Sequence, residues 1–492
     1  MKQQKTVEYW FVTGGQPLYG EEAIRQVQDH SRQIVAALNK SETISYTIQL
    51  KEVATTPDGI TRLCADANAD EQCAGLIAWM HTFSPAKMWI GGLSLLNKPL
   101  LHLHTQFNRE IPWDSIDMDF MNLNQSAHGD REFGFIGARM KIPRKVVAGY
   151  WADEHVQERI GTWMETTAAT IQGQSIRIAR FGDNMNEVAV TEGDKVEAQI
   201  KFGWSTQGYG IGDLVEVVQG VSEQDVRQLY EEYEHQYTID SKANKQSILE
   251  QTRIELGLKR FLEEGKFGAF TTNFDTLHGL DQLPGLAVQR LMQQGYGFGG
   301  EGDWKTAALL RLMKMMANGE QTSFMEDYTY HFEKGNELIL GSHMLEVCPT
   351  ISADKPKIEV HPLSIGGKSD PARMVFDSIE GEAIVASIIH LGDRFRLVMN
   401  EITAVKAEHH TPHLPVAKVL WKPKPSLETS AEAWIHAGGA HHTVLSYKIK
   451  PEQMLDWAKL VGIEAVLINN ETTIANVEKE LKWNDLAYKL SR

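Results

Sequence analysis

Apolar runs alternate with amphipathic segments along the first third of the chain. Val7–Thr13 and Cys73–Trp79 are short and almost wholly apolar, which is typical of strands buried on both faces of a sheet. Between them, Glu21–Asn39 carries apolar residues at helical spacing, and Pro85–Leu96 is a further predicted helix. Because strands that alternate with helices form parallel sheets, this pattern predicts a sheet with helices on both faces.

Two segments lie where such a sheet would bind a ligand, beyond the carboxyl ends of its strands. Gly14–Gly20 follows the first strand, and His81–Ser84 follows the strand that ends at Trp79. Asp114–Arg131 is polar and has little periodicity, so we expect a long functional loop there. It contains His128, which is a candidate site residue but equally a histidine without a functional role.

The alternation returns in the middle of the chain. Ser175–Phe181, Asp213–Val218 and Ala269–Asn273 read as strands, and Lys242–Glu264 reads as a long helix. Gly182–Met185 is a loop at the end of the first of these strands, and Phe274 and Asp275 follow the last. This part of the chain therefore predicts a second doubly wound domain.

The last third of the chain changes character, because short β-type runs there are separated by glycine and proline turns. These runs are Leu338–Leu340, Lys357–His361, Glu382–Leu391, Arg394–Glu401 and Thr443–Tyr447, and the helices Pro451–Val461 and Thr472–Leu481 follow. The predicted fold class is α/β, with two doubly wound, Rossmann-like domains (1–172 and 173–322) and a mostly antiparallel β-barrel-like C-terminal domain (323–492).

Composition and charge narrow the class of protein. The 492 residues are 42% hydrophobic and 23% charged, with a net charge of −16. No basic patch could neutralise phosphates, which argues against nucleic acids and anionic membranes as partners. Three cysteines imply no disulfide framework, and neither a signal core nor an apolar run of about 20 residues occurs. We expect a cytoplasmic protein that does not enter a membrane.

The candidate chemistry lies between residues 295 and 343. Glu301 follows a glycine-rich run, Glu326 comes one helix later, and His343 stands in a Gly-Ser-His motif. Carboxylate oxygen and neutral imidazole nitrogen are ligands that divalent cations accept, and several elements must supply them to fix the geometry. We expect a metal-dependent active site with a fourth ligand in Gly438–Thr443. Only one of His441 and His442 should reach the ion, because neighbours on a strand face opposite sides.

Each of these residues also has an interpretation without a metal. Glu301 would stabilise the positive end of the helix that follows it. Glu326 would be a surface residue, and His343 a hydrogen-bonded strand histidine. Judged by spacing alone, these alternatives stay open, because ligand sets drawn from distant segments have no regular interval.

Several other motifs are set aside. Gly295–Gly300 has the spacing of a dinucleotide-binding turn, but it follows a predicted helix rather than a strand. Glu408–His413 is predicted to be a solvated surface loop, and His102 and His104 to have a core or interface role. Nucleophilic hydrolase chemistry lacks support, because there is no Gly-x-Ser-x-Gly and Cys348 has no obvious activating partner.

Long motifs spread from end to end of the chain closely resemble those of the L-arabinose isomerase family. They are Val12–Gly20, Trp79–Trp89, Asp114–Arg139, Gly295–Thr306, Thr322–Gly335, His343–Pro349 and Ala437–Thr443. The resemblance implies an aldose–ketose isomerase that converts L-arabinose to L-ribulose, with D-galactose to D-tagatose as a side reaction. It also implies two α/β domains, a C-terminal β-barrel-like domain and a homohexamer built from trimers.

The resemblance further implies a manganese ion bound by Glu301, Glu326, His343 and His442. Both glutamates would also serve as the catalytic acid and base. The substrate-binding positions would be Gln16, Leu18, Phe83, His128, Met185 and Phe274. An enediol route is expected, with a metal-held hydride shift as its rival. The alternative functions are isomerisation of another aldose such as L-fucose, and sugar binding without catalysis.

Overall fold

The protein consists of two compact units, Met1–Ile171 and Gln172–Arg492. The structure is a computed structural model that describes residues 7–363, 367–407, 409 and 411–490. None of the helices in these ranges is both long and apolar enough to cross a membrane. The predicted surface loop at 408–413 includes Glu408 and His410, which lie outside the described residues.

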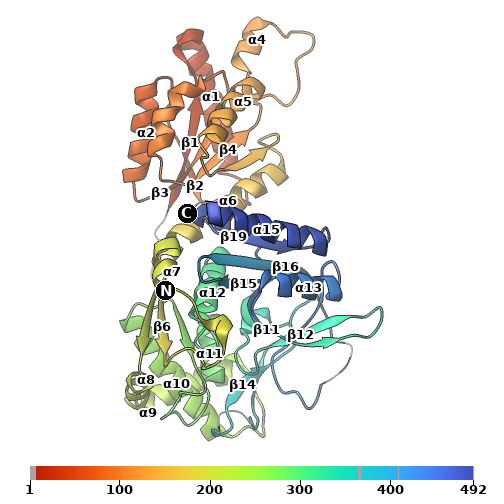
Figure 1. The fold of residues 1–492 in the computed structure, drawn as a ribbon. Coiled ribbons are helices and arrows are strands. Elements are labelled where there is room, and N and C mark those ends of the chain that lie inside the picture. Colours follow the sequence, from red (N-terminus) through yellow and green to blue (C-terminus); the bar gives the residue numbers. More distant parts are fainter. Residues whose placement is uncertain (1–6, 364–366, 408, 410, 491–492) are drawn as a thin grey trace. The chain divides into compact units, whose positions relative to one another are not determined.

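The first unit is built on a five-stranded parallel sheet in the order β2-β1-β3-β4-β5 (Figure 1). Its strands are β1 (Glu8–Gly14), β2 (Thr47–Leu50), β3 (Cys73–Met80), β4 (Leu100–His104) and β5 (Lys145–Ala148). Every residue of β3 is buried, as the unbroken apolar run predicts for a central strand.

Helices cover both faces of this sheet, and the side chains of β1 divide between them. Tyr9 and Phe11 pack with α1 (Gly20–Leu38) and α6 (Glu154–Gly173). Trp10 and Val12 pack on the opposite face, against α2 (Pro57–Ala69), α3 (Ile90–Leu95) and α5 (Ser126–Arg139). The predicted doubly wound arrangement is therefore confirmed for this unit.

The segment that was expected to be a long loop, 114–131, is partly helical, so that prediction was wrong. α4 (Met118–Leu123) starts at Asp117, whose side chain accepts a hydrogen bond from the Phe120 amide. α5 follows immediately, but several positions that it buries are serine, aspartate or glycine. Its helical period is invisible in an apolar pattern because small and polar side chains occupy the buried face.

The second unit begins with a four-stranded parallel sheet in the order β10-β9-β6-β7. Its strands are β6 (Arg177–Phe181), β7 (Ser205–Tyr209), β9 (Ala269–Thr272) and β10 (Gly297–Gly299). Among its helices are α7 (Lys195–Phe202), α8 (Ile211–Gln219), α9 (Glu223–Gln236), α10 (Lys245–Glu264), α11 (Gly285–Gln293) and α12 (Trp304–Met316).

The predicted strand Asp213–Val218 is instead part of helix α8. Its valines gave it a β-type composition, but only Leu214 and Val218 are buried, at helical spacing. Val218 packs against α10 at Gly257, where an added Cβ would lie 2.5 Å from the valine side chain. This close helix–helix contact overrides the weak local preference of β-branched residues. The sequence pattern missed two strands of this sheet, the polar β7 and the glycine-rich β10.

A closed antiparallel barrel follows the parallel sheet, in the cyclic order β15-β18-β11-β12-β17-β16. Its strands are β11 (Thr322–His331), β12 (Leu338–Ser342), β15 (Gly381–His390), β16 (Phe395–Val405), β17 (Val419–Pro423) and β18 (His442–Ser446). Pairing of β15 with β16 closes the ring, and β19 (Glu464–Ile468) adds to β16 in parallel. The predicted fold class is thereby confirmed.

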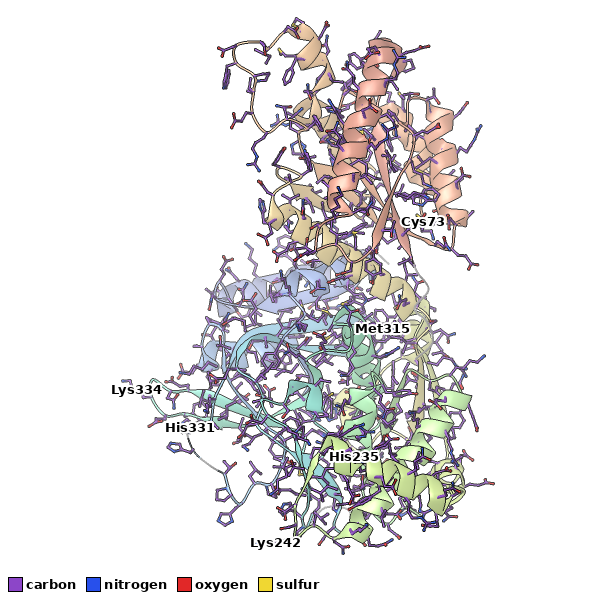
Figure 2. All side chains as sticks on the ribbon, turned by 180° about the vertical axis from the view of Figure 1, so that it is seen from behind. Cys73, His235, Lys242, Met315, His331 and Lys334 are labelled. Atoms are coloured by element: carbon purple, nitrogen blue, oxygen red, sulfur yellow. The ribbon has the colours of Figure 1, made fainter. Side chains whose placement is uncertain are left out.

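The remaining elements complete the second unit. β13 (Lys357–Val360), β14 (Ala372–Val375) and β8 (Thr238–Ile239) form a small separate sheet, and α13 (Leu427–Ala437), α14 (Pro451–Val461) and α15 (Ile474–Leu490) belong to the C-terminal part. α12 contacts β9 and β10 as well as β11, β15 and β18, so this helix joins the parallel sheet to the barrel. Figure 2 shows His331 and Lys334 at the projecting end of the β11–β12 hairpin.

Candidate functional site

The glycine-rich run before Glu301 is an edge strand, β10, rather than the turn that was predicted. An added Cβ would lie 2.1 Å from the Ala307 carbonyl oxygen at Gly297, and 2.3 Å from the Asp303 carbonyl oxygen at Gly299. Only glycine therefore lets α12 pack directly on this strand. Glu301 follows β10 at once, and so it lies at the carboxyl edge of the parallel sheet.

The backbone of Glu301 is held in a left-handed conformation, with φ 57°. Its carbonyl oxygen accepts a hydrogen bond from the Met185 amide at 2.9 Å, and the next amide, of Gly302, donates to Thr272 at 3.0 Å. These bonds fix the turn between the ends of β6 and β9. A non-glycine residue in this strained region is a common feature of functional sites.

Two further predicted ligands face each other on neighbouring barrel strands. Glu326 of β11 pairs directly with His442 of β18. Phe324, two residues before Glu326 and therefore on the same face of β11, contacts the rings of both His442 and His343, with centroids 5.1 Å and 4.6 Å away. His343 follows β12 directly, and its ring centroid lies 5.4 Å from that of His442.

Each of the two histidines uses its Nδ1 atom on a carboxylate of its own. His442 Nδ1 lies 3.2 Å from Asp303 Oδ2, and His343 Nδ1 lies 2.9 Å from Glu346 Oε2. A carboxylate at Nδ1 fixes the orientation of a ring and the tautomer that leaves Nε2 with a lone pair. His442 Nε2 is buried and has no hydrogen-bond partner.

The two Nε2 atoms converge beside Gly300. A Cβ built on this glycine would lie 2.8 Å from His343 Nε2 and 3.5 Å from His442 Nε2. Glu301 Oε2 lies 3.9 Å from His442 Nε2. A buried nitrogen without a partner, a second imidazole and a carboxylate beside Gly300 fit a divalent cation by their chemistry, although His343 does not belong to the group whose donor atoms all lie within 4.8 Å of one another.

His441 also reaches this carboxylate, while the expectation that only one of the two adjacent histidines reaches the ion stays a prediction. His441 Nε2 lies 3.4 Å from Glu301 Oε2. Strand alternation does not apply because β18 begins at His442, one residue later. Among the described residues, Glu301, His441 and His442 are the group whose potential metal-binding atoms all lie within 4.8 Å of one another.

The charges of these groups act on one another. The hydrogen bond to His441, followed by the nearby histidines, lowers the pKa of Glu301 despite its partial burial. The same hydrogen bond raises the pKa of His441. The charge of Glu326 contributes to the raised pKa values of His343 and His441, so this carboxylate belongs to the same electrostatic environment.

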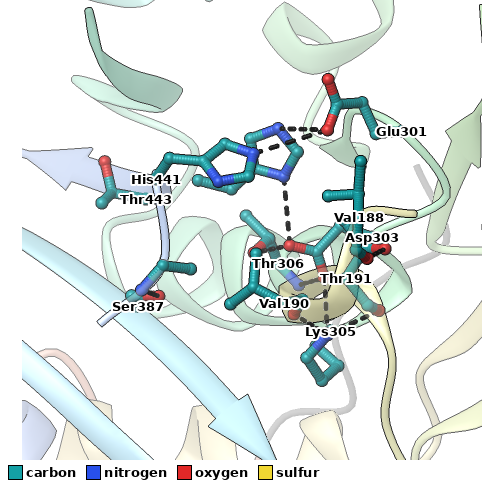
Figure 3. Close-up of polar contacts among 12 residues, drawn as sticks. Val188, Val190, Thr191, Glu301, Asp303, Lys305, Thr306, Ser387, His441 and Thr443 are labelled. Atoms are coloured by element: carbon teal, nitrogen blue, oxygen red, sulfur yellow. Dashed lines mark hydrogen bonds and ion pairs between the residues drawn. The ribbon is translucent and has the colours of Figure 1, made fainter. Parts of the chain in front are cut away.

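Asp303 is a functional candidate that sequence analysis missed. It caps α12 by accepting a hydrogen bond from the Thr306 amide (Figure 3), and its other oxygen lies 3.2 Å from His442 Nδ1. Burial would raise the pKa of this carboxyl, but the Lys305 ammonium and His442 outweigh that effect and hold the pKa well below its ordinary value. The only sequence signal was an aspartate two residues after Glu301, in a typical helix-capping position.

Four of the predicted substrate-binding residues lie in the first unit. Gln16 and Leu18 follow β1, Phe83 follows β3, and His128 is in the first turn of α5. The rings of Phe83 and His128 lie 4.6 Å apart, and the Leu18 side chain is 82% exposed. All four therefore belong to the carboxyl edge of the first sheet, where ligands of parallel sheets bind.

The other two predicted substrate residues lie in the second unit. Met185 follows β6 and Phe274 follows β9, at the same sheet edge as Glu301. The Met185 amide bonds to the Glu301 carbonyl oxygen, so the loop after β6 and the predicted ligand are held together. The assignment of all six residues to a sugar pocket stays a prediction.

Comparison with known proteins covers the whole length of the chain. Three family models match in succession: the L-arabinose isomerase N-terminal domain at residues 3–175, the central domain at 177–319 and the C-terminal domain at 321–464. L-arabinose isomerase 1 of Bacillus licheniformis is 65% identical, with 100% of both chains covered. The L-arabinose isomerase of Geobacillus stearothermophilus is 65% identical over 98% of each chain, and that of Bacillus subtilis 60% identical over 100% of each.

Such similarity over complete chains is far beyond what a shared fold alone would produce. It agrees with the motif blocks that were recognised in the sequence, and it extends the agreement to the segments between them. The chain belongs to the L-arabinose isomerase family of aldose–ketose isomerases.

Proposed function

We propose that the protein converts L-arabinose to L-ribulose in a reaction that depends on a divalent cation. Membership of the family supports the sugar and the reaction type. The observation that carries the metal dependence is the pair of imidazole Nε2 atoms, from His343 and His442, that converge beside Gly300 next to the carboxylate of Glu301.

Glu301, Glu326, His343 and His442 would hold the cation, and Mn²⁺ suits this mixed oxygen and nitrogen set. When bound, the ion would act as a Lewis acid that polarises two neighbouring sugar oxygens. The protein's own contribution is to orient the donors. Asp303 and Glu346 hold the two rings, and the constrained turn at Glu301 directs its carboxylate.

The reaction moves a proton between C1 and C2 of the open-chain sugar. In the enediol route a base removes the C2 proton and an acid serves O1. Glu301 and Glu326 are the carboxylates available for this work. The hydrogen bond with His441 favours the ionised form of Glu301, while His441 itself is a proton donor beside it.

The substrate would be bound by Gln16, Leu18, Phe83, His128, Met185 and Phe274. These positions combine an amide, an imidazole and apolar side chains, which is the composition that orients a small polar ligand. We extend the proposal to D-galactose as a secondary substrate, giving D-tagatose, and to a homohexamer built as a dimer of trimers. Sedimentation analysis tests the assembly, since a monomer would contradict it.

The function is tested by turnover of the metal-free protein after addition of Mn²⁺. We expect isomerisation of L-arabinose, slower isomerisation of D-galactose and negligible activity on L-fucose. A chelator and the substitution Glu301→Gln should each abolish turnover. Binding of L-arabinose without any L-ribulose would contradict the proposal and support a sugar-binding protein.

The chemical route has a separate test. Reaction in tritiated water should place tritium at C1 of the ketose if the proton passes through a glutamate that exchanges with solvent. Complete retention of the substrate hydrogen would reject the enediol route in favour of a hydride shift.

A further inference from the structure

Lys305 is a fully buried lysine next to the candidate metal centre. It is 0% exposed, and its Nζ atom donates to three oxygens: Thr191 O at 2.7 Å, Val190 O at 3.1 Å and Asp303 Oδ1 at 3.1 Å. An ammonium group is taken out of water at a cost unless it is paired and hydrogen-bonded. A buried charge does not contribute to solubility, so the role of Lys305 follows from the groups that its ammonium contacts.

The carboxylate of Asp303 receives donors on both oxygens. Oδ1 accepts from Lys305 and from the Thr306 amide, and Oδ2 accepts from the Thr306 hydroxyl at 2.7 Å. These bonds fix the rotation of the carboxylate, so that Oδ2 is presented to His442 Nδ1 (Figure 3). The chain of contacts therefore runs from Lys305 through Asp303 to a predicted ligand.

The two backbone acceptors of Lys305 belong to the loop that follows β6. Asn184 in this loop also donates to the Thr191 carbonyl oxygen, at 2.7 Å, and the Met185 amide bonds to Glu301. Lys305 thus joins α12 to the loop that supports Glu301 from the other side. One ammonium group connects the surroundings of two predicted ligands.

We propose that Lys305 is a positioning residue that sets the affinity of the centre for a divalent cation, by holding Asp303 in the orientation that fixes the His442 ring. This inference rests on the proposed function, since it assumes that His442 is a ligand. Lys305 itself contacts Asp303 and is not one of the proposed ligands. Outer partners of ligating histidines typically change metal affinity about 10–100-fold when they are removed.

A second buried lysine on the same helix provides a matched control. Lys314 is 1% exposed, and its Nζ atom donates to Thr322 O at 2.7 Å and lies 3.4 Å from Cys348 Sγ. No contact links it to Asp303 or His442. Replacing either lysine by methionine removes one buried ammonium group from α12, but only one replacement disturbs the Asp303 carboxylate.

The experiment measures Mn²⁺ binding to the chelator-treated full-length protein, with free Mn²⁺ followed by its electron paramagnetic resonance signal. Lys305→Met should raise the Mn²⁺ dissociation constant about 10–100-fold. Lys314→Met should leave the Mn²⁺ dissociation constant within about twofold of that of the unaltered protein. In the metal-free form, the two variants should lose thermal stability to a similar extent.

A double-variant cycle tests the route through Asp303. If Lys305 acts by holding this carboxylate, the double variant Lys305→Met/Asp303→Asn should bind Mn²⁺ about as weakly as Asp303→Asn alone. If the dissociation constant of the double variant instead rises by the product of the two single fold-changes, the proposal is overturned. A Lys305→Met protein that binds Mn²⁺ as tightly as the Lys314→Met protein would also overturn it.

Lys305→Gln, which keeps one donor for Thr191 O, replaces Lys305→Met if the latter does not fold. If neither variant folds while Lys314→Met does, Lys305 has a structural role and the proposal is wrong. Failure of the unaltered protein to bind Mn²⁺ would instead contradict the proposed metal centre and would be seen before any variant is compared.

Discussion

Two clusters of histidine and carboxylate, one in each unit, contain the same residue types in different arrangements. In the first unit, Asp130 is 2% exposed and lies 2.8 Å from His102 Nε2 and 2.9 Å from His104 Nδ1. Both rings turn a nitrogen to the same carboxylate, which also accepts a hydrogen bond from the Met80 amide. The carboxylate is the common point of this cluster.

In the second unit, each ring has a carboxylate of its own. His442 pairs with Asp303 and His343 with Glu346, and the remaining nitrogens meet beside Gly300, where no side chain stands. The difference teaches that a count of histidines and acids does not identify a metal centre. What matters is whether the ring nitrogens all bond to one carboxylate, or whether separate carboxylates hold the rings so that their remaining nitrogens point toward a common space.

The strongest test of this comparison replaces one histidine of each cluster. His442→Gln should lower kcat/KM for L-arabinose by about 1000-fold or more, equivalent to about 4 kcal/mol of barrier, because one of the proposed metal ligands is lost. His102→Gln should keep kcat/KM within about tenfold. Equal losses in the two variants would remove the distinction between the clusters.

The next test concerns stability in the first unit. Asp130→Asn should cost about 2–4 kcal/mol in the free energy of unfolding, because buried donors then lose their common acceptor. Urea denaturation of the metal-free protein measures this cost. Asp66→Asn, an equal change of charge at an exposed position of α2, should cost less than about 0.5 kcal/mol. A similar loss in both variants would show that the Asp130 cluster does not stabilise the unit.

A smaller effect is expected at the point where the two imidazoles converge. In Gly300→Ala, the new Cβ would lie 2.8 Å from His343 Nε2, so the ring must move. We expect Mn²⁺ to bind about 10–30-fold more weakly, with little change in thermal stability of the metal-free protein. Gly212→Ala, where an added Cβ meets nothing within 4 Å, is the control and should bind Mn²⁺ normally.

The last effect is a pH dependence from a histidine in neither cluster. Burial, with His30 nearby, lowers the pKa of His81 to about 3. The folded protein keeps this ring neutral while the unfolded chain protonates it below about pH 6.5. Its contribution to stability is therefore complete above pH 6.5 and falls by about 1.4 kcal/mol per pH unit as the pH drops toward 3. His81→Gln should flatten the dependence of melting temperature on pH between 6.5 and 5, and an unchanged slope would contradict this origin.

Much of the fold could be predicted because the buried strands of the parallel sheets are continuous apolar runs. β1, β3 and β9 lie within one or two residues of their predicted bounds. The errors occurred where burial does not coincide with apolar character. α5 buries serine, aspartate and glycine, so its period does not show in an apolar pattern. In α8 three valines, two of them only half-buried, gave a short helix the composition of a strand.

The sequence motifs named a set of ligands, which stays a prediction, but they did not indicate the residues that support that set. Glu301, Glu326, His343 and His442 stand in recognisable motifs, whereas Asp303 looked like an ordinary helix cap and Lys305 like any helical lysine. Asp303 contacts His442, 139 residues away in the chain, and Lys305 is linked to this histidine only through Asp303. Similarly, His441 can contact Glu301 because β18 begins one residue later, at His442. A sequence pattern does not place the start of a strand to within one residue.

The left-handed backbone at Glu301 restricts what protein engineering can place there. Asparagine and glycine adopt this conformation at low cost, whereas valine, isoleucine and threonine do not. In a saturation library at this position, we therefore expect the β-branched variants to misfold. Variants that fold but lack activity would show what the side chain does in the reaction, and variants that do not fold would show what the backbone requires.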